Sequence, residues 1–276
     1  MPYVESIGGR IWYDQVGEGP PLVFLHGFSL DRRMWAAQVS HFSRRWRCLV
    51  VDRRGHGLSD PPGDGWSVVA DLTAVLDDAE VGQASLIGLS QGGWEAVCFA
   101  LEEPRRVRAL VLIDALLPAP AGPAFSGAAA AVKLARAEGP AAAGTQWLAH
   151  PLFATALARP AVAERLQRMV TEHTWVEYRQ RVSRGPDPAV PYVERVGQMA
   201  APALVICGRD DLPEFQVMAE TYQRLLPRVD QGGVAWIEAA GHLANMEQPA
   251  AVNAVLERFL DAHRPKPPRM PGAARS

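Results

Sequence analysis

The chain has 276 residues, of which 48% are hydrophobic, so it is long enough to bury a large core in one α/β domain with or without an insertion. Its formal charge of −2 argues against the basic surface that nucleic acid or an anionic membrane would attract, and we expect neither partner. The first residues lack the pattern of a signal peptide, and no apolar run reaches the length of a membrane span. We therefore expect a soluble, cytoplasmic protein.

Apolar runs with the length of strands recur along the chain. Residues 3–7 and 10–15 alternate around a Gly-Gly pair, which predicts a β-hairpin. Continuous apolar runs, typical of strands covered on both faces, follow at 21–26, 47–52, 84–90, 107–114, 202–208 and 234–241. Helix-like segments lie between or after them at 32–42, 68–79, 91–102, 214–226 and 250–262. This alternation predicts an α/β fold with a mostly parallel sheet flanked by helices.

The alternation is interrupted between residues 117 and 199. This part is rich in proline and alanine and contains amphipathic helical pieces, so we interpret it as a helical cap inserted into the sheet domain. Residues 1–116 and 200–263 would then form the core domain. Residues 264–276, which are Pro-rich and basic, are expected to be a disordered tail. The three cysteines, at positions 48, 98 and 207, each lie in an apolar run and are expected to be reduced core residues.

The stretch LIGLSQGGW, residues 86–94, places Ser90 between an apolar strand and a helix-like segment, with Gly88 and Gly92 on either side. A serine at such a corner takes a strained backbone that presents its hydroxyl, and the start of the helix favours a developing negative charge. A plain alternative is a tight turn in which Ser90 only caps the helix. The motif alone does not decide between these interpretations.

A serine nucleophile needs a base, and the base needs an acid that orients it. His242 follows the last predicted strand, at the carboxyl edge where open sheets place their sites. For the acid, Asp210 and Asp211 both follow the strand at 202–208, and Asp114 ends the strand at 107–114. For Asp114 the plainer interpretation is a cap on the first helix of the insertion, so the pair Asp210 and Asp211 is favoured.

The chain from about residue 3 to residue 262 resembles the α/β-hydrolase superfamily. The resemblance is carried by HGF at 26–28, DRRGHGLSD at 52–60, GLSQGG at 88–93, GRDD at 208–211 and GH at 241–242. It implies a triad of Ser90, Asp211 and His242, with the second aspartate of GRDD preferred over the first. It also implies that the backbone N–H groups of Phe28 and Gln91 bind an oxyanion. His26 would then be a structural residue of its loop.

The resemblance also bounds the activity. A serine at position 90 argues against dehalogenases and epoxide hydrolases, which carry aspartate there. We expect a carboxylesterase acting on small to medium, largely apolar esters through an acyl-enzyme. The alternatives are a lactone or enol-lactone hydrolase or a C–C bond hydrolase, and, in another class, a cofactor-free lyase or a ligand receptor. The pocket candidates are Phe28, Trp94, Trp147 and Phe153.

Neither a metal nor a cofactor is expected. The histidines and cysteines do not follow metal-ligand spacings, and the glycines form no nucleotide-binding motif. The expected partner is therefore the small-molecule ester or lactone itself. The sequence leaves the oligomeric state open.

Overall fold

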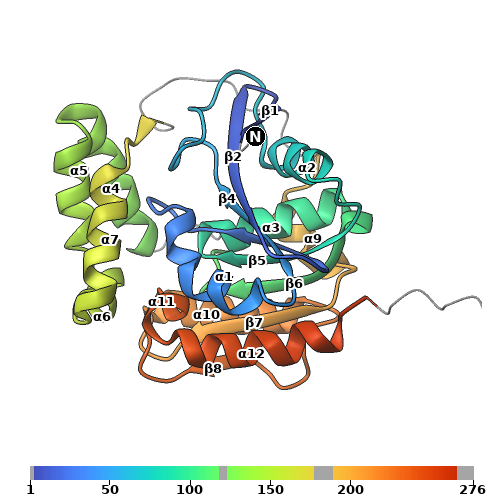
Figure 1. Ribbon diagram of the computed structural model, residues 1–276. Helices are drawn as coiled ribbons and strands as arrows, with labels where there is room; N and C mark the ends of the chain where they lie inside the picture. Colours follow the sequence, from blue (N-terminus) through green and yellow to red (C-terminus); the bar gives the residue numbers. More distant parts are fainter. Residues whose placement is uncertain (1–2, 118–122, 177–188, 266–276) are drawn as a thin grey trace, which may run out of the picture.

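The computed structural model describes residues 3–117, 123–176 and 189–265. Eight strands form one sheet in the order β1-β2-β4-β3-β5-β6-β7-β8 (Figure 1). β1 and β2 form an antiparallel hairpin, β2 pairs antiparallel with β4, and all other pairs are parallel. The strands are β1 (Tyr3–Ser6), β2 (Gly9–Val16), β3 (Pro21–Leu25), β4 (Arg47–Asp52), β5 (Ala84–Leu89), β6 (Val107–Ile113), β7 (Ala203–Gly208) and β8 (Ala235–Ile237).

The predicted α/β fold and its hairpin are confirmed. The central strands β5, β6 and β7 are buried along almost their whole length, because helices cover both faces of the sheet. β8 is shorter than the predicted run, because the chain turns away at Ala239, whose φ is +50°. Cys48, Cys98 and Cys207 are free and buried, as expected.

The helices of the sheet domain alternate with the strands. They are η1 (Arg32–Trp35), α1 (Ala36–Phe42), α2 (Val68–Asp78), α3 (Gln91–Glu102), η2 (Pro104–Arg106), α10 (Pro213–Leu225), α11 (Ala244–Glu247) and α12 (Pro249–Ala262). α1 packs with α12, whereas α2 packs with α3 (Figure 1). The single helix predicted over 32–42 is a 3-10 turn followed by α1. Asp31 caps that turn by accepting the Arg33 N–H at 2.9 Å.

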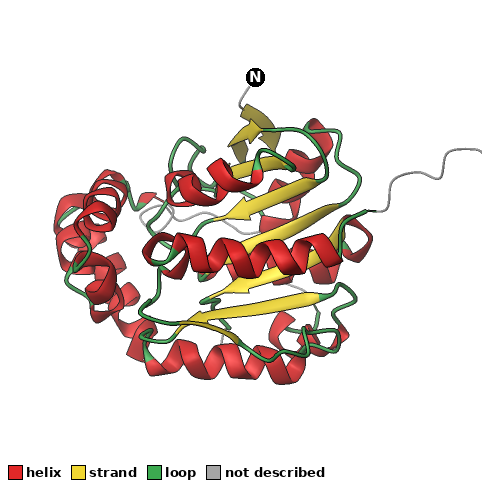
Figure 2. Ribbon diagram, turned by 60° about the horizontal axis from the view of Figure 1, so that its bottom comes forward, coloured by secondary structure: helices red, strands yellow, loops and turns green. Residues whose placement is uncertain are grey.

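Among the described residues 123–176, further helices stand beyond the carboxyl ends of the parallel strands (Figures 1 and 2). They are α4 (Pro123–Ala137), α5 (Pro140–Leu148), α6 (Ala154–Leu157), which follows the 3-10 turn η3 (Pro151–Phe153), and α7 (Pro160–Glu172). We call α4–α7 the helical layer. Within the described residues 123–176 there is no strand.

Two short helices end the part of the chain expected to form the insertion. α9 (Tyr192–Arg195) and η4 (Val196–Gln198) pack against α3 of the sheet domain. Trp94 of α3 and Tyr192 of α9 form an edge-to-face pair. The expected tail falls almost wholly outside the described residues. No helix among the described residues has the length and apolar character needed to cross a bilayer.

Candidate active site

Ser90 stands at the corner between β5 and α3. Its φ of +53° and ψ of −120° lie outside the regions that residues with a Cβ normally occupy. Its backbone is held from both sides, because the Ser90 N–H donates to Ile113 O at 3.0 Å and the Ser90 carbonyl accepts the Leu116 N–H at 3.0 Å. The chain at the end of β6 therefore holds Ser90 in its strained conformation. Such a conformation persists only where the surrounding structure holds it.

The two glycines of the motif are required by close backbone contacts. A Cβ on Gly88 would lie 2.4 Å from Gly92 O, and a Cβ on Gly92 would lie 2.3 Å from Leu25 O. Both contacts are with backbone atoms, which cannot move aside as a side chain can. The glycines thus allow α3 to start directly over the ends of β3 and β5.

His242 and Asp211 form a buried pair. The His242 Nδ1 lies 2.9 Å from Asp211 Oδ2, and the Asp211 Oδ1 accepts the N–H of Leu212 at 2.7 Å. The ring centroids of Phe215 and His242 are 4.2 Å apart. Because Nδ1 faces the carboxylate, the other ring nitrogen, Nε2, is left as the atom that can exchange a proton.

The other two acid candidates are not paired with His242. Asp210 is exposed, and its backbone N–H donates to Ala240 O at 2.8 Å. Asp114 is completely buried, and its Oδ1 accepts the Gly208 N–H at 2.7 Å. Burial, and then the charge of Asp211, raise the pKa of Asp114 well above its usual value.

A further residue, Glu247, holds the loop that carries His242. Its side chain accepts the N–H groups on both sides of the histidine, from Gly241 at 3.1 Å and from Leu243 at 3.2 Å. Thr155 of α6 donates to the same carboxylate at 3.2 Å. Sequence reasoning missed Glu247, and its only signal was a carboxylate in the short turn five residues after the histidine.

The loop after β3 carries Phe28 into the site. The next residue, Ser29, has a φ of +59° and is buried. Its hydroxyl donates to Phe28 O at 2.6 Å and accepts Nε1–H of Trp147 at 2.8 Å, so α5 of the helical layer holds this loop. Gln91 is the first residue of α3, and its backbone N–H has no acceptor within the helix.

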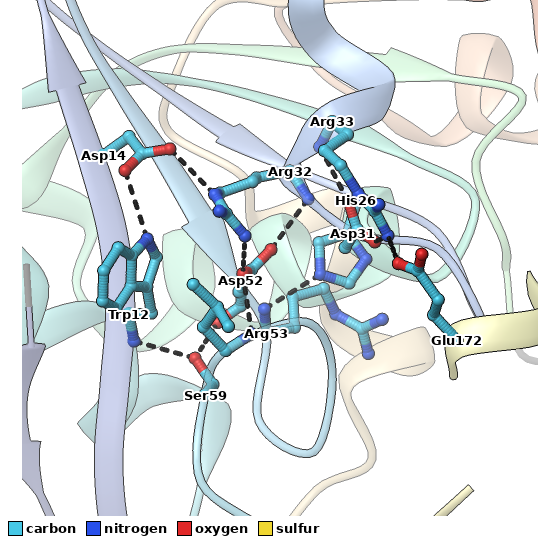
Figure 3. A network of polar contacts seen from close by, with 11 residues as sticks. Trp12, Asp14, His26, Asp31, Arg32, Arg33, Asp52, Arg53, Ser59 and Glu172 are labelled. Atoms are coloured by element: carbon cyan, nitrogen blue, oxygen red, sulfur yellow. Dashed lines mark hydrogen bonds and ion pairs between the residues drawn. The ribbon is translucent and has the colours of Figure 1, made fainter. Parts of the chain in front are cut away.

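His26 belongs to a polar network under the same loop (Figure 3). Its Nε2 accepts the Arg53 N–H at 2.9 Å, so its Nδ1 is the nitrogen that donates to Gly27 O at 2.8 Å. Burial, and then the charge of Arg53, lower the pKa of His26 to about 3, so the ring is neutral. Asp52 in this network accepts from the Arg32 and Leu58 N–H groups at 2.8 and 2.9 Å. His26 therefore braces the loop.

Ser90 and His242 face one cavity of about 580 Å³ that lies between the sheet edge and the helical layer. Apolar side chains from both regions line most of it, and these include three of the four pocket candidates, Phe28, Trp147 and Phe153. The fourth, Trp94, is not part of the described lining, because α3 turns its ring toward Tyr192.

Two cations of α4, Lys133 and Arg136, also line the cavity, and the described lining contains no carboxylate. Both side chains are exposed, so they stand where the cavity meets solvent. Sequence reasoning expected an apolar pocket and missed this pair. The signal that could have found it is the spacing of three residues on one helix, which brings two side chains to the same face.

Asp114, Cys207 and Asp211 place three potential metal-ligating atoms within 4.8 Å of one another. Burial raises the pKa values of both Asp114 and Cys207, and a metal ligand must be deprotonated. Asp211 already accepts from His242 and Leu212. The donor set therefore fits a cation poorly and fits a hydrogen-bonded cluster well.

A mostly parallel sheet that presents a strained serine and a histidine–aspartate pair to one covered cavity is the architecture of a large class of hydrolases. The model of the alpha/beta hydrolase family matches residues 22–255. The chain therefore belongs to the alpha/beta hydrolase family, and it is a hydrolase.

Relatives in this family carry several activities. The chain is 27% identical over 252 residues to "3-oxoadipate enol-lactonase 2" of Acinetobacter baylyi, covering 87% of this chain and 90% of that protein. It is 30% identical over 272 residues to a "2-hydroxy-6-oxononadienedioate/2-hydroxy-6-oxononatrienedioate hydrolase" of Burkholderia vietnamiensis, covering 91% of each. Among solved structures, a thermophilic esterase from Thermogutta terrifontis superimposes with a TM-score of 0.78 at 25% identity, covering 95% of this chain and 98% of that one.

Proposed function

We propose that the protein is a serine hydrolase of carboxylic esters, with Ser90 as nucleophile, His242 as general base and Asp211 as the acid that orients the imidazole. The observation that carries this proposal is that Ser90 and His242 line one cavity while Nδ1 of His242 is hydrogen-bonded to Asp211. The strained backbone at Ser90 supports the same assignment.

In this mechanism the Ser90 hydroxyl attacks the ester carbonyl carbon while His242 Nε2 takes its proton. The backbone N–H groups of Phe28 and Gln91 bind the resulting oxyanion, and the dipole of α3 favours the charge there. The intermediate collapses, the C–O bond breaks, and the leaving alcoholate takes the proton from His242. Water, deprotonated by His242, then attacks the acyl-enzyme, and Ser90 leaves with the proton returned.

The helical layer serves as the cap of this site in our proposal. Aromatic rings from it and from the sheet edge enclose an apolar space suited to the carbon chain of a small to medium ester. Trp147 has a second task, because it also holds Ser29 beside the proposed oxyanion donor Phe28.

Labelling with a fluorophosphonate probe tests the nucleophile. Wild-type protein is expected to be labelled and to hydrolyse p-nitrophenyl esters, and Ser90→Ala should lose both. Ser85→Ala is the matched control, because Ser85 is a buried serine of the same strand β5 that is not part of the cavity lining. An unlabelled wild-type protein would contradict the proposal and favour a ligand receptor, whereas turnover without an acyl-enzyme would favour a cofactor-free lyase.

A second candidate, a hydrolase of lactones or of C–C bonds in substrates that carry a carboxylate, is favoured by the two cations that line the cavity. Lys133 and Arg136 offer positive charge to an anionic group, and the names of two relatives describe an enol-lactonase and a hydrolase of dioate substrates. If it is correct, anionic lactones or dienedioate-type ketones should be turned over faster than neutral esters of equal length.

The two candidates are separated by substitution at the cations. Lys133→Met and Arg136→Met should each raise KM for anionic substrates by about two- to fivefold, the effect of losing about 0.5 to 1 kcal/mol at an exposed charge, and leave neutral esters unchanged. Arg168→Met is the control, because Arg168 of α7 is exposed, pairs with Glu164 and is not in the cavity lining. Equal rates on anionic and neutral substrates would favour the first candidate.

A further inference from the structure

Asp114 lies directly behind the histidine–aspartate pair. It directly follows β6, is 0% exposed, and has a carboxylate oxygen within 4.8 Å of one from Asp211. Its backbone φ of +43° and the bond from its N–H to Ile206 O at 2.9 Å fix it in this place. The site therefore contains two buried carboxyl groups and one imidazole.

Ionisation of both buried carboxyl groups is unfavourable, because the second would have to lose its proton beside the negative charge of the first. The hydrogen bonds show which one holds the proton. Both oxygens of Asp211 accept a bond, one from His242 Nδ1 and one from the Leu212 N–H. Asp114 accepts one bond, from Gly208 to Oδ1, and its Oδ2 has no donor among the described residues. These partners favour the negative charge on Asp211 and the proton on Asp114.

We infer that Asp114 is a protonated carboxylic acid that donates a hydrogen bond through Oδ2 to the Asp211 carboxylate and acts as a positioning residue for the Asp211–His242 pair. The proton stays on Asp114 throughout turnover, and no bond to it forms or breaks. This role rests on the proposed function for its kinetic consequences but not for the protonation state itself.

The groups that face Asp114 agree with this assignment. From β7 come the Cys207 thiol, whose pKa is raised by burial, and the Gly208 N–H. From the following loop comes Asp211, and His242 lies on the far side of Asp211. The hydrogen bonds from the Gly208 N–H and the Cys207 thiol favour a charged Asp114, but burial and the charge of Asp211 outweigh them. Burial, and then Asp211, raise the pKa of Asp114.

The arrangement limits the charge beneath the imidazole to one. A donated bond draws electron density from the Asp211 carboxylate, so Asp211 stabilises the imidazolium less than a bare carboxylate would. In this inference the imidazole of His242 is held in place, and it still releases its proton readily to the leaving group.

Two substitutions at position 114 separate charge from hydrogen bonding. Asp114→Asn keeps an acceptor for Gly208 and a donor for Asp211, and it copies the neutral acid in shape. For Asp114→Asn, the acid limb of the kcat/KM profile against pH is expected to lie within about 0.3 pH units of the wild-type limb. Asp114→Ala removes the donor, so its acid limb should move to higher pH by about half to one unit. Asp210→Asn is the control, because it removes an exposed carboxylate of the adjacent loop.

The opposite result for Asp114→Asn would overturn the inference. If Asp114 were ionised, that substitution would remove a negative charge near His242 and move the acid limb to lower pH by about one unit or more. An Asp114→Ala profile identical to wild type would also overturn the positioning role. Should the alanine variant not fold, Asp114→Ser replaces it, since its shorter side chain also breaks the contact.

Infrared spectroscopy reads the protonation state without any substrate. The wild-type minus Asp114→Asn difference spectrum at pH 7 should contain the C=O band of a protonated carboxylic acid, and the same difference for Asp210→Asn should not. A carboxylate band in its place would refute the inference even if the enzyme is active. Absence of fluorophosphonate labelling with the acid band present would instead refute the proposed function alone.

Discussion

Two regions meet at the cavity, and they are held in different ways. At the sheet edge, Ser90 and the strand ends around it are fixed by backbone hydrogen bonds and by glycines at which a Cβ would collide with backbone atoms. In the helical layer, contact with the site runs through single side chains, such as Trp147 to Ser29 and Thr155 to Glu247. The sheet edge therefore has little freedom to change, whereas the helical layer can exchange residues and alter what the cavity accepts.

The largest effect is expected at the sheet edge. Asp211→Asn should lower kcat by about 10⁴, because the imidazole loses the acceptor that fixes its tautomer. Ester hydrolysis at saturating substrate measures it. Asp210→Asn, on the same loop, should stay within a few-fold of wild type, and equal losses in the two variants would contradict the assignment of the acid.

A second test addresses the backbone of the same region. Gly92→Ala places a Cβ 2.3 Å from Leu25 O and should destabilise the fold by about 4 kcal/mol or more, as overpacking against backbone does in severe cases. Gly82→Ala is the matched control, because nothing lies within 4 Å of a Cβ there. Thermal unfolding should separate the two, and a Gly92→Ala protein as stable as Gly82→Ala would show that the corner can relax.

Glu247 tests the junction between the two regions. Glu247→Ala leaves the N–H groups of Gly241 and Leu243 without their acceptor, so the His242 loop should lose its position and kcat should fall by about 10². Glu247→Gln keeps one acceptor oxygen and should recover part of the loss. If KM rises while kcat is unchanged, Glu247 acts on the substrate and not on His242.

A contact made only by the helical layer should matter less. Trp147→Phe keeps most of the ring packing but removes the bond to Ser29, which costs about 1 kcal/mol and should lower kcat about fivefold. Trp236→Phe, at a half-buried tryptophan of β8 outside the cavity lining, is the control. A drop as large as that of Asp211→Asn would remove the distinction between the two regions.

The smallest effect concerns acid stability. The pKa of His26 is about 3 in the folded protein and near its ordinary value when unfolded, so between these values the unfolded chain binds the extra proton. Stability should therefore fall as the pH is lowered from about 6.5 toward 3. Melting temperatures between pH 7.5 and 5 should fall less steeply for His26→Gln than for wild type, and His41→Gln, at a more exposed histidine on α1, should follow wild type.

The sequence predicted the parts of the molecule that follow from local chemistry. Continuous apolar runs gave the parallel strands, and the glycines around Ser90 indicated a strained corner. It could not predict contacts made by residues far apart in the chain. Glu247 reaches the helical layer, and Lys133 meets the cavity only because α4 folds over the sheet edge. Among Asp114, Asp210 and Asp211, the resemblance selected Asp211, whereas local chemistry alone left Asp210 and Asp211 open because only the folded chain brings one of them to His242.

The close approach of Gly208 to the loop before His242 has a consequence for recombination between related chains. A Cβ at this position would lie 2.2 Å from Gly241 O and 2.5 Å from Ala240 O, so β7 and the loop before His242 touch backbone to backbone. The segment that brings Asp211 and the segment that brings His242 are therefore matched surfaces. A chimaera whose crossover falls between residues 208 and 241 takes these two contacting segments from different parents. A crossover before β7 takes both segments from one parent and keeps their contact.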